Sequence, residues 1–175
     1  MAEHTRRNAR PALLGGYVTY PTLVVGTTVL TWIVMMLGSY TGAIGAGLSC
    51  PDWPTCYGVL VPWFHPQVVA DSPYTALQIF AEWFHRGMAM VAGILIVGVA
   101  IAAWRLYRDR PAVVWPAVLA VVLLPFQVVL GGLTVTEDLA PLIVTAHLGT
   151  ATALLVMLGV SATAATLVHR GSVRP

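Results

Sequence analysis

Residues 111–135 read PAVVWPAVLAVVLLPFQVVLGGLTV, an apolar stretch without a single charged side chain. A helix needs about 20 residues to cross a hydrocarbon core, so this stretch is long enough to span a membrane. Three more stretches have the same character, over about residues 18–40, 74–104 and 139–168. The first of them is too long for the apolar region of a signal peptide, so we expect a retained helix. The sequence therefore predicts an all-α membrane protein, a bundle of four transmembrane helices.

The composition of the whole chain agrees with this prediction. Of its 175 residues, 58% are hydrophobic, 9% are charged and none is lysine. A soluble domain has about 25% charged residues, so the composition argues against a water-soluble fold. We expect residues 1–175 to form one multi-pass transmembrane domain in the plasma membrane, with residues 48–73 as an external loop. No nucleic-acid partner is expected.

The arginines predict how the bundle is oriented. Eight of the nine lie before the first stretch, between the second and third, or after the fourth, at Arg6, Arg7, Arg10, Arg105, Arg108, Arg110, Arg170 and Arg174. These segments share one side of the membrane, and residues 48–73 share the other side with the turn at Glu137 and Asp138. Because arginine-rich segments stay in the cytoplasm, we predict that both termini are cytoplasmic.

The chain has two cysteines, Cys50 and Cys56, and both lie in the predicted external loop. The compartment outside a plasma membrane permits disulfides, so we expect the two residues to pair. So short a loop gains little stability from chain entropy, but the bond would hold its shape. Two free thiols are one alternative. A metal site formed by the two cysteines and His65 is another alternative, although no further ligands follow at a suitable spacing.

Four ionisable residues lie within the apolar stretches: Glu82, His85, Arg86 and His147. A charge at bilayer depth costs at least about 2.5 kcal/mol, so such residues are candidates for function. His85 lies roughly 13 Å, and His147 roughly 9 Å, inside the ends of two helices that run in the same direction. Two imidazoles at one depth suit the two axial positions of a heme iron. Zinc or copper would need further ligands, and a hydrogen bond across a helix interface would need no cofactor.

The neighbours of the histidines indicate how a heme could be held. Glu82 lies one turn outward from His85 on the same helical face, where its carboxylate could act as a general acid or base. An ion pair between Glu82 and Arg86 is the alternative. Arg86 could also bind an anionic heme propionate. Gln127, Gly131 and Gly132 of the third stretch lie toward the same outer end. The two glycines would allow either a flat ligand or another helix to approach closely.

Four segments carry a resemblance to a known family. They are residues 50–56 (CPDWPTC) in the external loop, 82–86 (EWFHR) in the second stretch, 127–135 (QVVLGGLTV) in the third and 145–149 (TAHLG) in the fourth. In this order, and on these four elements, they resemble heme A synthase. The resemblance covers nearly the whole chain.

The resemblance implies an activity and a role for each matching residue. Members of the family oxidise the C8 methyl group of heme O to a formyl group, which yields heme A. The resemblance implies that His85 and His147 are axial ligands of the heme iron and that Glu82 is needed for the chemistry. It also implies a disulfide between Cys50 and Cys56, which can be redox-active in the family. Heme b, heme O or heme A would then be the ligand or substrate, at a site toward the external face.

The chain departs from the family in one respect, and alternative functions remain open. Family members usually have eight helices in two tandem halves with a histidine pair in each, whereas this chain has one such half. We therefore expect a homodimer or higher homo-oligomer, with residues 38–42 as a helix contact between copies. Heme O synthase and the assembly of a terminal oxidase are the expected partners. The alternatives are a cytochrome b that only passes electrons, which would not need Glu82, and a heme carrier or assembly protein without turnover.

Overall fold

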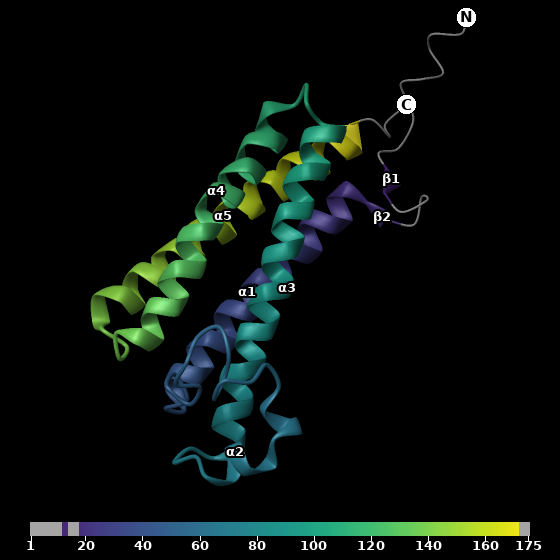
Figure 1. The fold of residues 1–175 in the computed structure, drawn as a ribbon. Coiled ribbons are helices and arrows are strands. Elements are labelled where there is room, and N and C mark those ends of the chain that lie inside the picture. Colours follow the sequence, from purple (N-terminus) through teal and green to yellow (C-terminus); the bar gives the residue numbers. More distant parts are fainter. Residues whose placement is uncertain (1–11, 14–17, 172–175) are drawn as a thin grey trace, which may run out of the picture.

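The computed structural model describes residues 12–13 and 18–171, and four long helices account for most of them (Figure 1). These helices are α1 (Tyr20–Ala43), α3 (Ala76–Leu106), α4 (Pro111–Thr136) and α5 (Pro141–Gly171). Within the described ranges, the four are long and apolar enough to cross a membrane. The predicted all-α fold with four transmembrane helices is therefore confirmed.

The predicted orientation is a separate matter from the fold. It rests partly on Arg6, Arg7, Arg10 and Arg174, which lie outside the described residues. The cytoplasmic position of both termini therefore stays a prediction.

Two short elements precede and interrupt the long helices. An antiparallel pair of two-residue strands, β1 (Ala12–Leu13) and β2 (Val18–Thr19), comes before α1. The loop between α1 and α3 contains a 3-10 turn, η3 (Pro62–Phe64), and a five-residue helix, α2 (Pro66–Ala70). The sequence analysis expected neither the strands nor the small helix, because each is too short to give a periodic apolar pattern.

The starts of the long helices follow from local sequence. The side chain of Thr75 accepts a hydrogen bond from the backbone of Gln78, whose own side chain accepts one from the backbone of Thr75. This capping box satisfies backbone groups that the first turn of α3 leaves open. Helices α4 and α5 each begin at a proline, Pro111 and Pro141, whose fixed φ suits the first helical position.

The helices form two antiparallel pairs that meet in a four-helix bundle. Helix α1 contacts α3 and α5, and α4 also contacts α3 and α5. Helices α3 and α5 are therefore diagonal to each other. Figure 1 shows the α4–α5 pair leaning away from the α1–α3 pair toward the end that carries residues 44–75.

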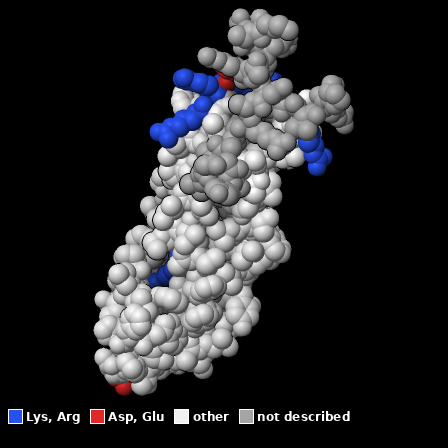
Figure 2. Space-filling model, turned by 90° about the vertical axis from the view of Figure 1, so that its right-hand side faces the viewer, with Lys and Arg blue, Asp and Glu red and all other residues white. Residues whose placement is uncertain are grey.

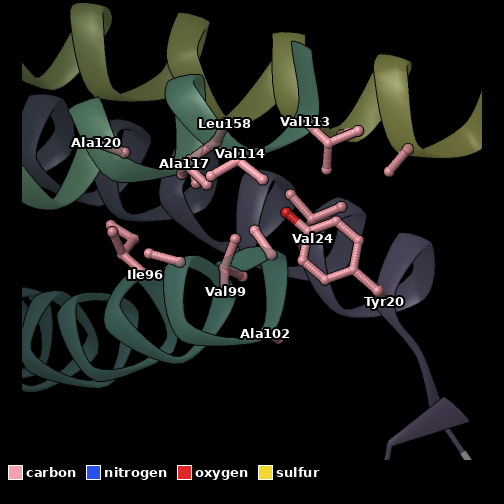
Figure 3. Close-up of a cluster of buried hydrophobic side chains, with 14 of the residues drawn as sticks. Tyr20, Val24, Ile96, Val99, Ala102, Val113, Val114, Ala117, Ala120 and Leu158 are labelled. Carbon is pink, nitrogen blue, oxygen red and sulfur yellow. The ribbon is translucent and has the colours of Figure 1, made fainter. Parts of the chain in front are cut away.

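The buried apolar core lies at the opposite end, where the helix pairs converge. Figure 3 shows side chains from all four long helices in contact, among them Tyr20 and Val24 of α1, Val99 of α3, Val113 and Ala117 of α4 and Leu158 of α5. Many members of the cluster are alanine, which lets helix backbones approach closely. On α3 the cluster ends at Ile96, and His85 lies about 16 Å beyond it along the helix. The described apolar cluster therefore stops short of the histidines.

A polar link ties three helices together inside this core. The Ser161 hydroxyl donates a hydrogen bond to the backbone carbonyl of Val113, at 2.8 Å. The Tyr20 hydroxyl lies 2.9 Å from the same Ser161 oxygen and must donate to it, because the serine proton is already used. Helices α1, α5 and α4 are thus joined where water is absent.

Basic side chains gather at the end of the molecule that bears the termini. Figure 2 shows them there, and it also shows basic atoms inside a hollow nearer the opposite end. Between residues 11 and 104 the sequence has one arginine, Arg86. A cation at this depth needs compensation from its protein surroundings.

Replacing Leu158 with alanine tests the position of the core. The side chain is fully buried, so Leu158→Ala should leave a cavity and lower the free energy of unfolding by about 2 kcal/mol. This loss is near the low end of those measured for Leu-to-Ala substitutions in the cores of soluble proteins, because a side chain that leaves the core of a membrane protein enters lipid rather than water. Unfolding in mixed micelles by a denaturing detergent would measure the change.

Leu167, on the same helix, provides the matched control. It is 63% exposed, so Leu167→Ala should change the unfolding free energy by no more than about 0.5 kcal/mol. Equal losses in the two variants would contradict the packing described for α5.

Candidate functional site

His85 and His147 lie on the diagonal helices α3 and α5. His85 is about 14 Å from the start of α3, and His147 is about 9 Å from the start of α5. Both side chains are partly buried. The two histidines therefore lie at similar depths on two helices that run in the same direction.

Each imidazole lies against a glycine of the neighbouring helix. A Cβ atom added at Gly38 of α1 would lie 2.9 Å from Cε1 of His85 and 3.3 Å from its Nε2. A Cβ atom added at Gly131 of α4 would lie 3.1 Å from Cε1 of His147. All three distances are shorter than an ordinary van der Waals contact between a carbon atom and an aromatic ring atom. Any side chain larger than hydrogen would therefore displace the rings.

Several polar atoms around the histidines are buried and unpaired. Among the described residues, neither Nδ1 of His85 nor Nδ1 of His147 has a hydrogen-bond partner, and the same holds for Oε1 of Gln127. The Gln127 side-chain nitrogen lies 3.4 Å from Nε2 of His147. Most buried polar atoms in proteins have partners, so this group has the character of a ligand-binding site.

The residues present fit a heme better than a bare metal ion. Among residues 12–13 and 18–171, no three His, Cys, Asp or Glu side chains are grouped as a protein-bound metal ion requires. A porphyrin brings its own equatorial nitrogens, so two imidazoles complete the coordination of its iron. Each ring has its Cε1 atom nearest to the glycine of the neighbouring helix, beyond the end of the apolar core. This arrangement suits a flat ligand between the two helix pairs.

Glu82 lies where the sequence analysis expected it, one turn outward from His85. The residue is only 6% exposed, and the side chain of Thr41 lies beside its carboxylate. Nε of Arg86 donates to Oε1 of Glu82 at 2.9 Å. The ion pair, one of the two interpretations of Glu82, is therefore present, and it keeps a buried carboxylate next to a histidine.

Arg86 uses its remaining donors to hold the external loop. Nη1 donates to the backbone carbonyls of Asp52, at 2.7 Å, and Thr55, at 2.8 Å. Nη2 donates to the carbonyl of Cys50 at 2.8 Å. The guanidinium therefore faces the loop. A contact with a heme propionate stays a prediction, and it would require the loop carbonyls to give up some of these hydrogen bonds.

The loop itself is closed by the predicted disulfide, which is confirmed. Cys50 and Cys56 are bonded, with their Cα atoms 4.6 Å apart, and both are buried against Ile79 of α3. The carboxylate of Asp52 accepts three hydrogen bonds within the loop, from the Thr55 hydroxyl and from the backbone N–H groups of Tyr57 (2.5 Å) and Gly58 (2.9 Å). Desolvation would raise the pKa of Asp52, but these bonds favour its charged form and leave the pKa below the usual value.

The indole of Trp53 packs on the opposite helix pair. A Cβ atom added at Gly132 of α4 would lie 3.2 Å from Cδ2 of Trp53. The loop is therefore fixed to α3 through Arg86 and to α4 through Trp53. Gly131 and Gly132 do allow a close approach, as expected, but in the described structure the approaching groups are a histidine ring and an indole of the chain itself.

A repeated motif that the sequence analysis missed places both histidines. Residues 37–41 (LGSYT) of α1 and 130–134 (LGGLT) of α4 share the pattern Leu-Gly-X-X-Thr. Residues 85–87 (HRG) and 147–149 (HLG) share His-X-Gly on the helix that follows in each pair. Aligning the two hairpins with each other would have revealed the pattern. Its small-residue spacing is too common in membrane helices to draw attention alone.

The same motif bears on one expectation, which stays a prediction. Residues 38–42 were expected to form a helix contact between copies of the chain. In the structure the space beside Gly38 is taken by the ring of His85, whereas a Cβ atom at Gly42 would meet none of the described residues within 4 Å. Gly38 therefore serves a contact inside the bundle.

Comparisons with known proteins add to this geometry. A family model described as COX15-CtaA, cytochrome oxidase assembly protein, matches residues 21–174. A heme A synthase of Shewanella oneidensis is 37% identical over 130 residues, which cover 70% of this chain and 38% of the relative. A heme A synthase of Geobacillus thermodenitrificans is 28% identical over 127 residues, or 71% of this chain and 36% of the relative.

A relative named for a different enzyme activity also matches. A protoheme IX farnesyltransferase of Halobacterium salinarum is 36% identical over 101 residues, which cover 58% of this chain and 20% of the relative. The matched region thus spans less than two-fifths of the length of each of these relatives. No solved structure matches the chain.

Removing the Arg86 guanidinium should loosen the external loop. Arg86→Gln loses the charge-assisted bonds to three loop carbonyls, each worth roughly 1.5–3 kcal/mol. Amide hydrogen exchange in residues 50–59 should therefore become at least about 100-fold faster. Exchange measured by mass spectrometry in lipid nanodiscs would test this. Arg105→Gln, an exposed arginine at the far end of α3, should leave these rates unchanged; equal protection in both variants would contradict the anchoring role.

The loop should also loosen in acid because of Asp52. Its folded-state pKa lies below its unfolded-state value of about 3.9, so the carboxylate stabilises the loop fully above that pH. This stabilisation is lost as the pH falls through the lower folded-state pKa. Exchange of the Gly58 amide, followed by NMR from pH 6 downward at fixed temperature, should accelerate beyond its intrinsic pH dependence. Asp52→Asn should remove the excess acceleration, and an unchanged profile in that variant would argue against the assignment.

Proposed function

We propose that this chain, which belongs to the COX15-CtaA family of cytochrome oxidase assembly proteins, is a membrane oxidoreductase that converts heme O to heme A. One observation carries the proposal. Two imidazoles on the diagonal helices α3 and α5 lie beyond the end of the apolar core, each against a glycine of a neighbouring helix, and a buried carboxylate lies one turn from one of them. Relatives named heme A synthase support the same activity.

In this proposal His85 and His147 are the axial ligands of the heme iron. The bound heme supplies the iron that accepts the imidazoles and, as substrate, the C8 methyl group that becomes a formyl group. Gln127 and Gly131 border His147, and Gly132 lies under the indole of Trp53, so these residues line the ligand. A metal-ligating imidazole donates its other N–H group to an acceptor, so the two unpaired Nδ1 atoms would each need an acceptor once the rings hold iron.

Glu82 is the proposed catalytic residue. Oxidation of the methyl group to a formyl group takes one oxygen atom from water and releases four protons and four electrons. The electrons pass to an external electron acceptor, and a buried carboxylate beside the site can accept the protons in turn. Arg86 keeps this carboxylate oriented through the 2.9 Å ion pair. Because the carboxylate is shielded from water, changes in the charges around it affect it more strongly than they would affect a carboxylate in water.

A second candidate function rests on the same ion pair. A carboxylate already neutralised by Arg86 has a structural partner and needs no catalytic role. In that case the histidine pair would hold a heme that only passes electrons, as in a cytochrome b, or a heme that is carried and released during oxidase assembly. These functions predict heme binding without change to the heme.

Partners, location and assembly belong to the same proposal. A region similar to this chain occurs within a protein named protoheme IX farnesyltransferase, which supports a heme-farnesylating enzyme as a partner that supplies heme O. We also propose that the chain works as a homodimer or higher homo-oligomer, in which a second copy supplies a second histidine pair. We place the chain in the plasma membrane with its heme site toward the external face, on the strength of the arginine distribution.

Turnover of heme O separates the two candidate functions. The purified wild-type protein in nanodiscs, given heme O and a soluble one-electron acceptor, should produce hydroxylated and formyl hemes. Glu82→Gln should reduce the rate at least about 100-fold, because it removes the proton acceptor without removing the axial ligands. Extracted hemes would be separated by chromatography and identified by mass.

The control variant is Glu137→Gln, which changes an exposed carboxylate in the turn between α4 and α5. It should keep wild-type turnover. Unchanged heme O in the wild-type reaction, together with an intact bis-histidine absorption spectrum, would reject the enzyme in favour of an electron carrier or heme carrier. Absence of that spectrum would reject the heme site altogether.

A further inference from the structure

We propose that Gly38 and Gly131 are positioning residues for the two histidines, each allowing an imidazole to reach the backbone carbonyl of the residue four positions earlier. The inference rests on the proposed heme site and assigns it two residues from the facing helices. Its starting point is the pair of short contacts at Gly38 and Gly131 described above.

Several other helical glycines among the described residues lack such a contact, although a Cβ atom at Gly132 would lie 3.2 Å from the indole of Trp53. A Cβ atom at Gly42, Gly87 or Gly149 would meet none of the described residues within 4 Å. Glycine in the middle of a helix is destabilising relative to alanine, so its presence at Gly38 and Gly131 calls for a compensating contact. The histidine rings are that contact.

The missing side chains open a path to one particular carbonyl in each hairpin. The backbone carbonyl of Val34 lies near the imidazole of His85, and the backbone carbonyl of Gln127 lies near that of His147, although among the described residues neither Nδ1 completes a hydrogen bond. Val34 precedes Gly38 by four residues, and Gln127 precedes Gly131 by four residues. In a helix the carbonyl four residues earlier lies directly beside the glycine, where a Cβ atom would block a ring.

The chemistry of metal-binding histidine explains why this carbonyl matters. A ligating imidazole almost always donates its other N–H group to a carboxylate, a carbonyl or water, which fixes the ring and its tautomer. Within the described structure neither Nδ1 completes a hydrogen bond. The nearby carbonyls are thus the acceptors available to Nδ1–H once Nε2 holds a ligand, and the glycines keep them within reach.

The threonine of each motif fixes the glycine segment. The Thr41 hydroxyl donates to the carbonyl of Gly38, and the Thr134 hydroxyl donates to the carbonyl of Gly131, both at 2.7 Å. Each glycine carbonyl thus accepts a second hydrogen bond, which stabilises the helical turn at the glycine. The Leu-Gly-X-X-Thr motif therefore acts as a unit, and it acts twice.

Two substitutions with matched controls test the proposal. Gly38→Ala and Gly131→Ala should each displace their own ring, whereas Gly42→Ala and Gly149→Ala should not. In the protein without heme, side-chain NMR of ¹⁵N-labelled histidine should show shifted signals for His85 alone in the first variant and for His147 alone in the second. This readout does not depend on the proposed function. Ring signals of Gly38→Ala identical to those of Gly42→Ala would overturn the positioning role.

A titration with heme b tests the consequence for binding. Gly38→Ala should weaken heme binding by about 10- to 100-fold, the usual effect of losing an outer-shell partner of a metal-ligating histidine. Gly131→Ala should have a smaller effect, since its Cβ contact is the longer of the two. Normal heme binding by a variant whose ring has moved would overturn the link between the glycines and the ligand.

A double-variant comparison separates positioning from a folding defect. If Gly38 acts through the ring of His85, Gly38→Ala should cause no further loss of heme affinity in a His85→Ala background, but its full loss in a His147→Ala background. A loss that persists undiminished without His85 would overturn the proposal. Failure of the wild-type protein to bind heme through either histidine would instead reject the proposed function, and the NMR test would still stand.

Discussion

The outer half of this protein is organised around the compensation of one buried cation. Arg86 lies within a helix that spans the membrane, where an uncompensated charge would be costly. Its donors reach Glu82 on its own helix and three carbonyls of the external loop. The loop is long and contains little regular structure, and these bonds anchor it to α3 together with hydrogen bonds to Gln78 and Trp83. The disulfide between Cys50 and Cys56 keeps the three carbonyls converged on one guanidinium.

The two halves of the bundle are stabilised by different forces. Near the termini the helices pack through alanine and branched side chains, with Tyr20 and Ser161 adding a polar link among three of them. Around the histidines the described apolar cluster has ended, and the loop links the helix pairs, as with Trp53 on Gly132. The packed half fixes the relative positions of the helices.

The sequence predicted the features that depend on composition and on position along a helix. The four spans, the disulfide and the matched depth of His85 and His147 all follow from local patterns and a fixed rise per residue. The partners of Arg86 could not be predicted in this way. They are backbone carbonyls, which every residue has, and only the path of the loop decides which of them converge. The role of Gly38 was missed for a similar reason, since a glycine in a membrane helix does not reveal which neighbour it admits.

The placement of Glu82 links the loop to the chemistry proposed for the site. Its carboxylate shares the Arg86 guanidinium with the carbonyls of Cys50, Asp52 and Thr55. A guanidinium has a fixed geometry and a limited number of donors, so any movement of the loop changes how strongly Arg86 is held near Glu82. The buried carboxylate therefore cannot be treated as an isolated base. Its surroundings depend on the position of the loop that Arg86 also holds, and the disulfide between Cys50 and Cys56 closes that loop.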